Sequence, residues 1–537
     1  MKNIRKITNL KWIFILAVLF SMVSCEKDLD ISPKDDDDFT SQQFYANPES
    51  YRQFLAKIYA GLAVTGQKAP DGESDLGSGD NAVNEGFSAY LRGYWQLQEL
   101  TTDEAIIAWQ ENDNPTIKDL NFNTWNKDNV FAEAYFARIF FQIGLCNEFL
   151  RETTEEKLSS RGVTDAKKAE VRTFRAEVRF LRALSYYHGI DIFGKLPFAT
   201  EEDPLGTVPQ MQSRQYVFDF ILSELNAIDP ELKDPRTNEY ARADKAAAWM
   251  LKAKLLLNAK VFTNTDRSDE ALTAVNAVIG SSYKLMTGPD KPYSNLFKAD
   301  NNSNGAQEEI IFPIAFDGFK TPSWGGMTYL LHAGCTTEVG LLIGIDFGWA
   351  GYRVRKEFVD NVGNTDPRVM FVPGNTDPAT ITDYTKFEQG KKLMKFSNFK
   401  SDGSAGQDLT QGDADFPMFR MGDAYLMYAE LAVVDGKGSM ATALQYVNDL
   451  RTRAGAANVT MGDLNADFIL KERGRELYWE GMRRQDLIRF GKYLSGYNWQ
   501  WKGGVQSGIS LPESKLLFAI PAKELNSNPN LSQNPGY

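Results

Sequence analysis

The chain has 537 residues, a formal net charge of −12 and an aromatic content of 12%. A chain this acidic, without a long run of lysine or arginine, repels phosphate backbones, which excludes nucleic acid as a bulk partner. Two histidines and three cysteines leave little material for histidine-based catalysis or for a zinc site.

The N-terminal segment predicts export. Residues 1–11 carry four cations and residues 12–23 form a mostly apolar run. The run is shorter than the ~20 residues that span a bilayer, so residues 1–24 are expected to be a signal peptide. The run ends in Met22, Val23, Ser24 and Cys25, which is similar to a lipoprotein signal that makes Cys25 the lipidated N-terminus and a membrane anchor. The alternative is an ordinary signal with a chance cysteine.

The next segment reads as a tether. Residues 25–39 include four consecutive aspartates, and such a charged run is typical of a flexible, solvated connection. Glu26, Lys27 and Asp28 resemble the acidic tag that sends lipoproteins to the cell surface.

The rest of the chain predicts a mostly α-helical fold. Apolar residues recur at helical spacing over residues 41–62, 128–150, 169–190, 216–228, 244–262, 269–279, 423–434, 440–454 and 468–490. Residues 244–262 and 269–279 are joined by a short polar turn, as are 423–434 and 440–454. Both pairs place alanines where helices approach closely, which is typical of tetratricopeptide-like (TPR-like) helical hairpins.

These patterns predict one domain over residues 40–537. Its TPR-like helices are expected at about 41–64, 128–280 and 415–494, and two loop-rich inserts at about 65–127 and 281–414. The inserts are rich in glycine, asparagine, aspartate and aromatic residues, with only short apolar runs. Long loops in compact proteins usually carry function, so we expect the inserts to bind the ligand.

Catalytic motifs are absent from the sequence. It contains no G-x-S-x-G, H-E-x-x-H, C-x-x-C or Walker A pattern, so we expect no enzyme activity, no cofactor and no bound metal. Asp300 begins a partial EF-hand pattern, but Ile311 stands where the bidentate glutamate belongs. His188 is expected in the core, whereas His332 lies in an aromatic insert where it can touch a ligand. With 71 acidic residues, a glycosidase carboxylate pair stays open.

Three stretches resemble the SusD/RagB family of surface nutrient-binding lipoproteins. They are residues 176–197, the motifs within 416–489, and residues 520–537. The resemblance implies a SusD-like α-solenoid that is lipid-anchored in the outer membrane and faces the cell surface. Within the second stretch, Glu480 and Arg484 are spaced as an i,i+4 helix pair and are expected to be scaffold.

The founding, starch-binding member of that family implies a binding site. Residues 102–112, 325–330 and 348–349 are similar to its glycan-contacting segments. The site residues that this resemblance implies are Trp109, Trp324, Trp349, Arg92, Asn112 and Asn84. Trp109, Trp324 and Trp349 would form an aromatic arc, and the other three would bond sugar hydroxyls. Asp80 or Glu85 is the alternative to Asn84.

One departure concerns Ile107. It stands where the relative has a further tryptophan, so the implied aromatic platform is one ring smaller than in the relative. The ligand preference of the relative therefore does not carry over directly to this chain. Sugars offer an apolar C–H face and a rim of hydroxyls, and flat aromatic rings with a few fixed donors and acceptors suit both.

The resemblance implies that the chain captures starch or malto-oligosaccharides and delivers them to a SusC-type TonB-dependent transporter, breaking no bond. Three alternatives stay open: the same module tuned to another polysaccharide, a surface glycosidase, and a TPR-like scaffold for protein contacts.

Overall fold

A computed structural model describes residues 40–537 except 71–73, 78–82, 111–113, 289–291 and 364. Cys25, Asp80 and Asn112 therefore lie outside the described residues. The chain divides into a short unit, Met1–Tyr51, and a large unit, Arg52–Tyr537. In the short unit, Thr40 caps helix α2 (Ser41–Phe44), where its hydroxyl accepts a hydrogen bond from the Gln43 backbone nitrogen.

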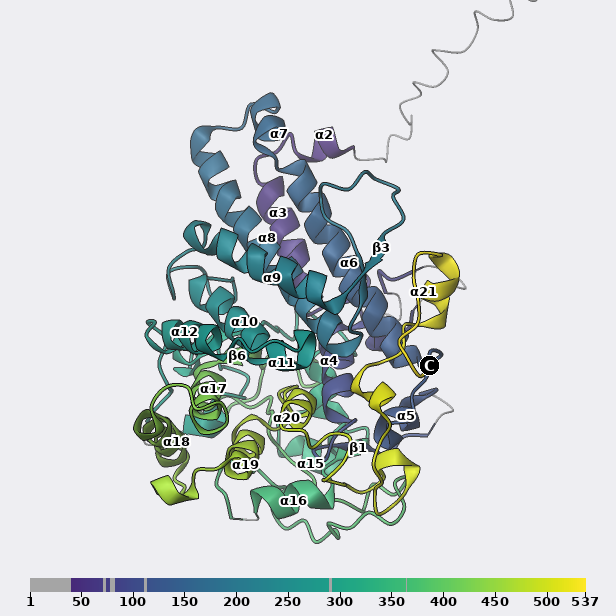
Figure 1. Cartoon of the computed structure of the whole chain (residues 1–537), viewed down its shortest axis with the longest axis vertical. Coiled ribbons are helices and arrows are strands. Elements are labelled where there is room, and N and C mark those ends of the chain that lie inside the picture. Colours follow the sequence, from purple (N-terminus) through teal and green to yellow (C-terminus); the bar gives the residue numbers. More distant parts are fainter. Residues whose placement is uncertain (1–39, 71–73, 78–82, 111–113, 289–291, 364) are drawn as a thin grey trace, which may run out of the picture. The chain divides into compact units, whose positions relative to one another are not determined.

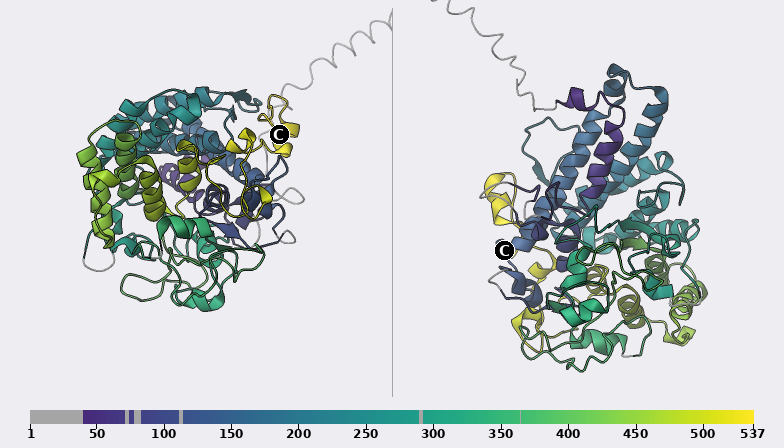
Figure 2. Two further views of the ribbon diagram at one scale, coloured as in Figure 1. Left: turned by 60° about the horizontal axis from the view of Figure 1, so that its bottom comes forward. Right: turned by 180° about the vertical axis from the view of Figure 1, so that it is seen from behind.

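Helices dominate the large unit (Figure 1). The longer ones are α4 (Tyr90–Glu99), α6 (Val130–Glu152), α8 (Asp165–Ile192), α9 (Arg214–Ile228), α10 (Lys245–Leu257), α12 (Ser268–Ile279), α17 (Met421–Val433), α18 (Met440–Ala454) and α19 (Ala466–Leu477). Helix α6 packs on α8, α8 on α9, α10 on α12, and α17 on both α18 and α19. Figure 2 shows the same arrangement of helices from two further directions. Both predicted helical hairpins are therefore present.

Helix starts are explained by capping side chains. Asn129, Thr164, Ser213, Asp244 and Ser439 stand immediately before α6, α8, α9, α10 and α18. Each side-chain oxygen accepts a hydrogen bond from a backbone N–H in the first turn, which satisfies a donor that has no partner inside the helix.

Three predicted helices are each broken in two. Residues 244–262 form α10 and the short α11 (Ala259–Thr263), with Asn258 between them. Residues 41–62 form α2 and α3 (Ser50–Ala60), separated by a turn that contains Pro48, which disfavours the α conformation in the residue before it. Residues 468–490 form α19 and α20 (Arg483–Arg489). Between α19 and α20, Trp479 and Gly481 take positive φ angles of 60° and 79°, which no helix accommodates.

That break makes the predicted Glu480–Arg484 pair wrong. Glu480 precedes α20, and its carboxylate pairs with Arg420 at 2.7 Å and Lys395 at 2.6 Å. Arg484 instead donates to the Leu516 backbone oxygen at 2.6 Å. An i,i+4 contact requires both residues on one continuous helix face, and the turn removes that condition.

A buried ionic cluster ties the C-terminal helices together. Arg420 also reaches Glu309 at 3.1 Å and Glu476 at 2.7 Å, and Arg368 approaches Glu476 at 3.2 Å. These side chains are almost completely buried. Buried charges need partners and hydrogen bonds to compensate for lost hydration, so the charged motifs of this region serve the scaffold.

Among the described residues, three two-stranded antiparallel ladders accompany the helices. Strand β1 (Ile106–Ile107) pairs with β5 (Tyr352–Arg353), β2 (Leu196–Phe198) with β3 (Gln210–Gln212), and β4 (Ile310–Ile314) with β6 (Phe416–Arg420). The first ladder joins the two segments that were expected to be inserts. It lies directly beside the candidate site.

The expected inserts also hold helices. Residues 65–127 contain the fully buried α4 and the short α5 (Ile117–Phe122). Residues 281–414 contain α13 (Pro292–Asn295), α14 (Met327–His332), α15 (Thr337–Leu341) and α16 (Lys356–Val362). His188 is buried on α8, where its Nδ1 lies 2.8 Å from the Tyr90 hydroxyl, so it is a core group as predicted.

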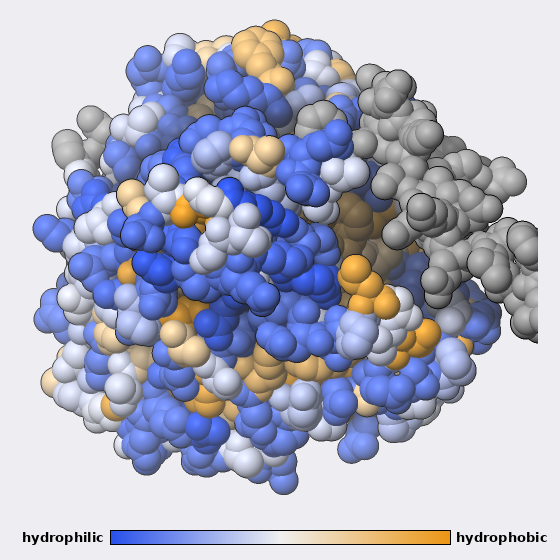
Figure 3. Space-filling model, turned by 90° about the horizontal axis from the view of Figure 1, so that it is seen from above, coloured by the Kyte–Doolittle hydropathy of each residue, from blue (hydrophilic) through white to orange (hydrophobic). Residues whose placement is uncertain are grey.

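Within the described ranges, no helix is both long and apolar enough to cross a bilayer. The same ranges hold no group of three or more histidine, cysteine, aspartate or glutamate side chains arranged for a metal ion. On the face in Figure 3, hydrophilic residues predominate and hydrophobic ones gather in small groups.

Candidate functional site

The β1–β5 ladder brings two tryptophans together. Trp109 follows β1 and Trp349 precedes β5. The register, which pairs Ile107 with Tyr352, continues to Trp109 opposite Ala350, the residue after Trp349. The ladder continues through a hydrogen bond from the Ala108 nitrogen to the Gly351 oxygen at 2.8 Å. The indole nitrogen of Trp109 then donates to the Trp349 backbone oxygen at 2.9 Å, and the ring centroids are 6.3 Å apart.

Trp324 extends this pair to a row of three. Its ring centroid is 6.1 Å from that of Trp349, with the planes inclined by 55°. The buried Glu85 carboxylate holds the backbone at Trp324 in place. It accepts hydrogen bonds from the Trp324 backbone nitrogen at 3.0 Å and from the Ser323 hydroxyl at 2.8 Å. All three residues are half-buried. We call Trp109, Trp324 and Trp349 the tryptophan row.

His332 supports the middle of the tryptophan row. Its ring centroid is 5.0 Å from Trp349 and 4.5 Å from Phe347. Its Nε2 lies 2.7 Å from the Thr410 backbone oxygen. Burial lowers the pKa of His332, so the ring is neutral at neutral pH and Nε2 donates to that oxygen.

Arg92 lies under the Trp109 end of the row. This α4 residue is 5% exposed, and its Cζ is 4.4 Å from the Tyr329 ring centroid and 6.0 Å from that of Trp109. Its Nη2 lies 3.4 Å from Asn114 Oδ1, while its Nε has no hydrogen-bond partner among the described atoms. Burial lowers the pKa of Arg92 and raises the pKa of Tyr329 to about 12. The cation is thus held by aromatic faces.

The other polar residues predicted for the site differ from Arg92 in burial and in hydrogen bonding. Asn84 is exposed, and its Oδ1 accepts the Phe87 nitrogen at 3.2 Å. Glu85, its alternative, is buried and accepts hydrogen bonds from Thr65, Ser323 and Trp324, so protein donors occupy its carboxylate. Ile107, which stands where a further tryptophan was expected from the relative, is fully buried in β1 and offers no surface to a ligand.

A cleft of about 730 Å³ opens beside the tryptophan row. Its lining residues are Ala108, Trp109, Gln110, Asn114, Trp349, Ala350, Thr385, Lys386, Phe387 and Glu388. Two indoles therefore form one side of the cleft and the segment 385–388 forms part of its lining. Such a space, with aromatic faces and several polar groups, matches the chemistry of a sugar site.

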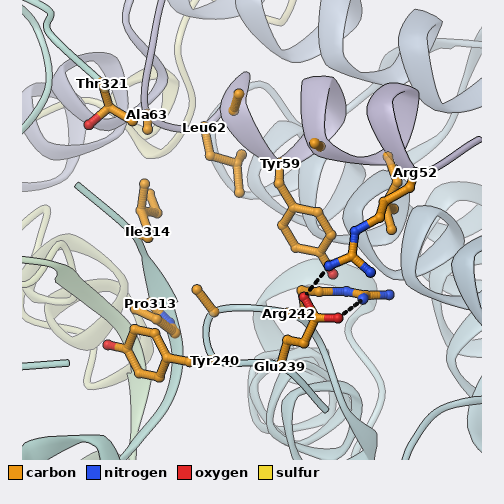
Figure 4. A pocket seen from close by; sticks show the side chains of 15 residues that line it. Arg52, Tyr59, Leu62, Ala63, Glu239, Tyr240, Arg242, Pro313, Ile314 and Thr321 are labelled. Carbon is orange, nitrogen blue, oxygen red and sulfur yellow. Dashed lines mark hydrogen bonds and ion pairs between the residues drawn. The ribbon is translucent and has the colours of Figure 1, made fainter. Parts of the chain in front are cut away.

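A second cavity, of about 310 Å³, lies elsewhere in the large unit (Figure 4). Its polar rim is internally paired: Glu239 binds Arg52 at 2.6 Å and Arg242 at 3.2 Å. Much of its remaining wall is apolar, with Leu62 and Ile314. Its lining includes none of the site residues predicted from the sequence.

Sequence reasoning left several neighbours out of the site. Tyr329 lies within a segment that the resemblance singled out, and His332 was already a possible ligand contact, so both carried a signal. Asn114 and the segment 385–388 carried none, because only the folded chain places them beside the tryptophan row.

Comparisons with known proteins agree on one family. The SusD family model matches residues 341–537. The starch-binding protein SusD of Bacteroides thetaiotaomicron is 35% identical, covering 97% of this chain and 98% of its own. A SusD superfamily structure from Parabacteroides distasonis has a TM-score of 0.69 at 22% identity, covering 93% of this chain and 100% of its own. A laminarin-binding SusD-like protein has a TM-score of 0.64 at 20% identity, covering 91% and 99%. The predicted mostly α-helical fold is confirmed.

Proposed function

Because the chain belongs to the SusD family, we propose that it binds starch and malto-oligosaccharides at the cell surface, through Trp109, Trp324 and Trp349. The observation that carries the proposal is the tryptophan row: residues 109, 324 and 349, far apart in the sequence, are three half-buried tryptophans with neighbouring ring centroids 6.3 and 6.1 Å apart. The relative with 35% identity over 97% of this chain is named for starch binding, which favours an α-glucan.

The geometry of the row suits a chain of sugars that changes direction. Neighbouring indole planes are inclined by 57° and 55°, so successive rings face different directions and the platform is not flat. Each ring offers its face to the C–H side of one sugar. Arg92, Asn112 and Asn84 would bond hydroxyls at the edge of the row. Binding is non-covalent and no bond is broken.

The proposal extends to anchoring and delivery. Cys25 would carry the lipid anchor and residues 25–39 the tether, and the captured glycan would pass to a SusC-type TonB-dependent transporter. The lipoprotein-like signal supports the anchor, and family membership supports the transporter.

A second candidate is another glucan. The fold is shared with a laminarin-binding SusD-like protein, and Ile107 removes a ring that the starch-binding relative has. A different linkage would present sugar faces at other angles to the same indoles. The third candidate, a surface glycosidase, predicts release of new reducing ends.

Calorimetric titration of the full chain tests the function. The protein is held in a detergent without a sugar head group and titrated with maltoheptaose and α-cyclodextrin, with laminarihexaose and cellohexaose as controls. We expect binding to the α-glucans with no release of reducing ends. Binding to laminarihexaose alone would replace starch by a β-glucan, and new reducing ends would make the protein an enzyme.

A further inference from the structure

The cleft beside the tryptophan row has a wall that no family motif indicated. Thr385, Lys386, Phe387 and Glu388 line the same cleft as Trp109 and Trp349. We call residues 384–390 the wall loop. Its position follows from contacts with the strand that also places Trp349.

Arg353 of strand β5 holds the wall loop by its backbone. Its Nε donates to the Gln389 oxygen at 2.6 Å, and its Nη2 donates to the Tyr384 and Lys386 oxygens at 2.5 and 3.0 Å. Arg353 is fully buried and lies four residues after Trp349. One short strand therefore positions both the indole and the wall loop.

Further contacts make the wall loop rigid. The Gln389 Oε1 accepts the backbone nitrogens of Thr382 at 2.7 Å and Asp383 at 2.8 Å. The Tyr384 ring packs at 5.0 Å from Phe122 and 5.7 Å from Trp501. A wall that is already in place costs little conformational entropy when a ligand binds.

The exposed part of the wall loop offers polar groups of both charges. Phe387 is 7% exposed, with the Lys392 ammonium 4.6 Å from its ring centroid, so it forms a fixed base. Lys386 and Glu388 flank it and are exposed. An ammonium donates to sugar hydroxyls and a carboxylate accepts from them. Their charges cancel, so this pair carries no net charge that would favour an acidic chain over a neutral one.

We infer that residues 385–388 form a further subsite, continuous with Trp109 and Trp349, that binds additional hexose units of a neutral glucan. The inference rests on the proposed function and deepens it. A short oligosaccharide covers the indoles alone, whereas a longer one also reaches Lys386 and Glu388. Affinity therefore rises with chain length beyond what the tryptophan row supplies.

A length series tests the subsite. Maltotriose, maltopentaose and maltoheptaose are titrated into the full chain and into a Lys386→Ala/Glu388→Ala variant, and the matching laminari-oligosaccharides are titrated in parallel. For the series that binds, we expect the variant to hold the heptaose about tenfold more weakly than the wild type does. We expect it to hold the triose equally well.

Two further variants separate the possible failures. Lys437→Ala/Asp269→Ala removes a different surface pair, with atoms 2.8 Å apart on the α12–α17 side, and should bind like the wild type. Trp349→Ala should weaken binding at every length. Equal heptaose affinity in the wall-loop variant and the wild type overturns the subsite while Trp349→Ala still reports the proposed function. An equal loss for triose and heptaose also overturns it. If Trp349→Ala binds glucans as tightly as the wild type does, the proposed function itself is overturned.

Discussion

Gly351 lies directly against the ring of Trp109. A Cβ built on Gly351 would stand 2.7 Å from Trp109 Cε2 and 2.9 Å from the Ala333 backbone oxygen. Both distances are shorter than carbon and oxygen atoms tolerate, and the second neighbour is backbone that cannot rotate away. Only a residue without a side chain lets the Trp109 indole reach the Trp349 oxygen.

Gly351→Ala should therefore damage the site more than the fold. The Trp109 ring must shift and lose its hydrogen bond to Trp349, and we expect glucan affinity to fall about tenfold. Calorimetry measures the affinity and thermal unfolding measures the fold. Gly144→Ala is the control, because nothing lies within 4 Å of its new Cβ on α6. It should bind normally and gain up to about 1 kcal/mol of stability. Normal binding by Gly351→Ala would contradict the site.

Removing an indole of the tryptophan row should weaken binding without unfolding the chain. Trp349 contacts both other indoles, so Trp349→Ala should lose ~1–3 kcal/mol of glucan binding, as truncated aromatic anchors do. Trp109→Ala and Trp324→Ala should lose similar amounts. Tyr216→Ala removes an aromatic ring that is 48% exposed on α9 and should have no effect. Wild-type titrations for all three tryptophan variants would refute the assignment.

A pair of buried carboxyls makes stability fall as the pH rises. Burial raises the pKa of Glu99 to about 7, and the pKa of Glu104 is raised by burial and by Glu99. The folded state thus binds a proton that an unfolded glutamate releases near pH 4.3. The contribution of this bound proton to the free energy of unfolding is present at low pH and is lost as the pH rises from about 4.5 through 7.

Glu99→Gln removes the part of this pH dependence that Glu99 contributes. The amide oxygen can still accept the Gly481 nitrogen, which lies 2.6 Å from Glu99 Oε1. Relative to the wild type, we expect the variant to gain about 1–3 kcal/mol in unfolding free energy between pH 5 and pH 8. Urea unfolding at the two pH values measures the difference. A difference that stays constant over that range would disprove a raised pKa for Glu99.

The buried ionic cluster should be costly to break. Glu476 faces Arg368, Arg420 and Arg453, and these cations lower its pKa even though burial opposes the shift. Glu476→Gln removes a counter-charge shared by three buried guanidiniums and leaves them with their remaining carboxylate partners alone, so we expect a loss of about 3–5 kcal/mol. Glu156→Gln, an exposed change on α7 (Glu155–Ser160), should stay within about 0.5 kcal/mol of the wild type. Urea unfolding of both variants decides the point.

The periodic parts of the fold could be predicted from the sequence, but local breaks could not. Helix α8 follows its apolar spacing and is capped by Thr164, and both kinds of signal are local. The break before α20 depends on positive φ angles at Trp479 and Gly481, and tryptophan gives no warning of that conformation. The structure pairs Glu480 with Arg420 and Lys395. Both are distant from Glu480 in the chain, so an i,i+4 rule cannot predict them.

The candidate site shows the same division. The resemblance singled out Trp109, Trp324 and Trp349 one by one, and their juxtaposition comes from the fold. Strands of two residues are too short to show an alternating pattern. The wall loop is fixed through backbone oxygens, which every residue type possesses, so its residue types do not reveal its place.

The span between Trp109 and Trp349 is 240 residues. On a ribosome that adds ~5–20 residues per second, the first indole waits at least about 12 s for its partner to be made. A fragment that ends before β5 lacks the strand whose pairing with β1 brings the two indoles together. If the chain binds glucan as proposed, sugar affinity reports that the nascent chain has been synthesised and folded through Arg353. A truncated copy would then be recognisable by its failure to be retained on immobilised glucan.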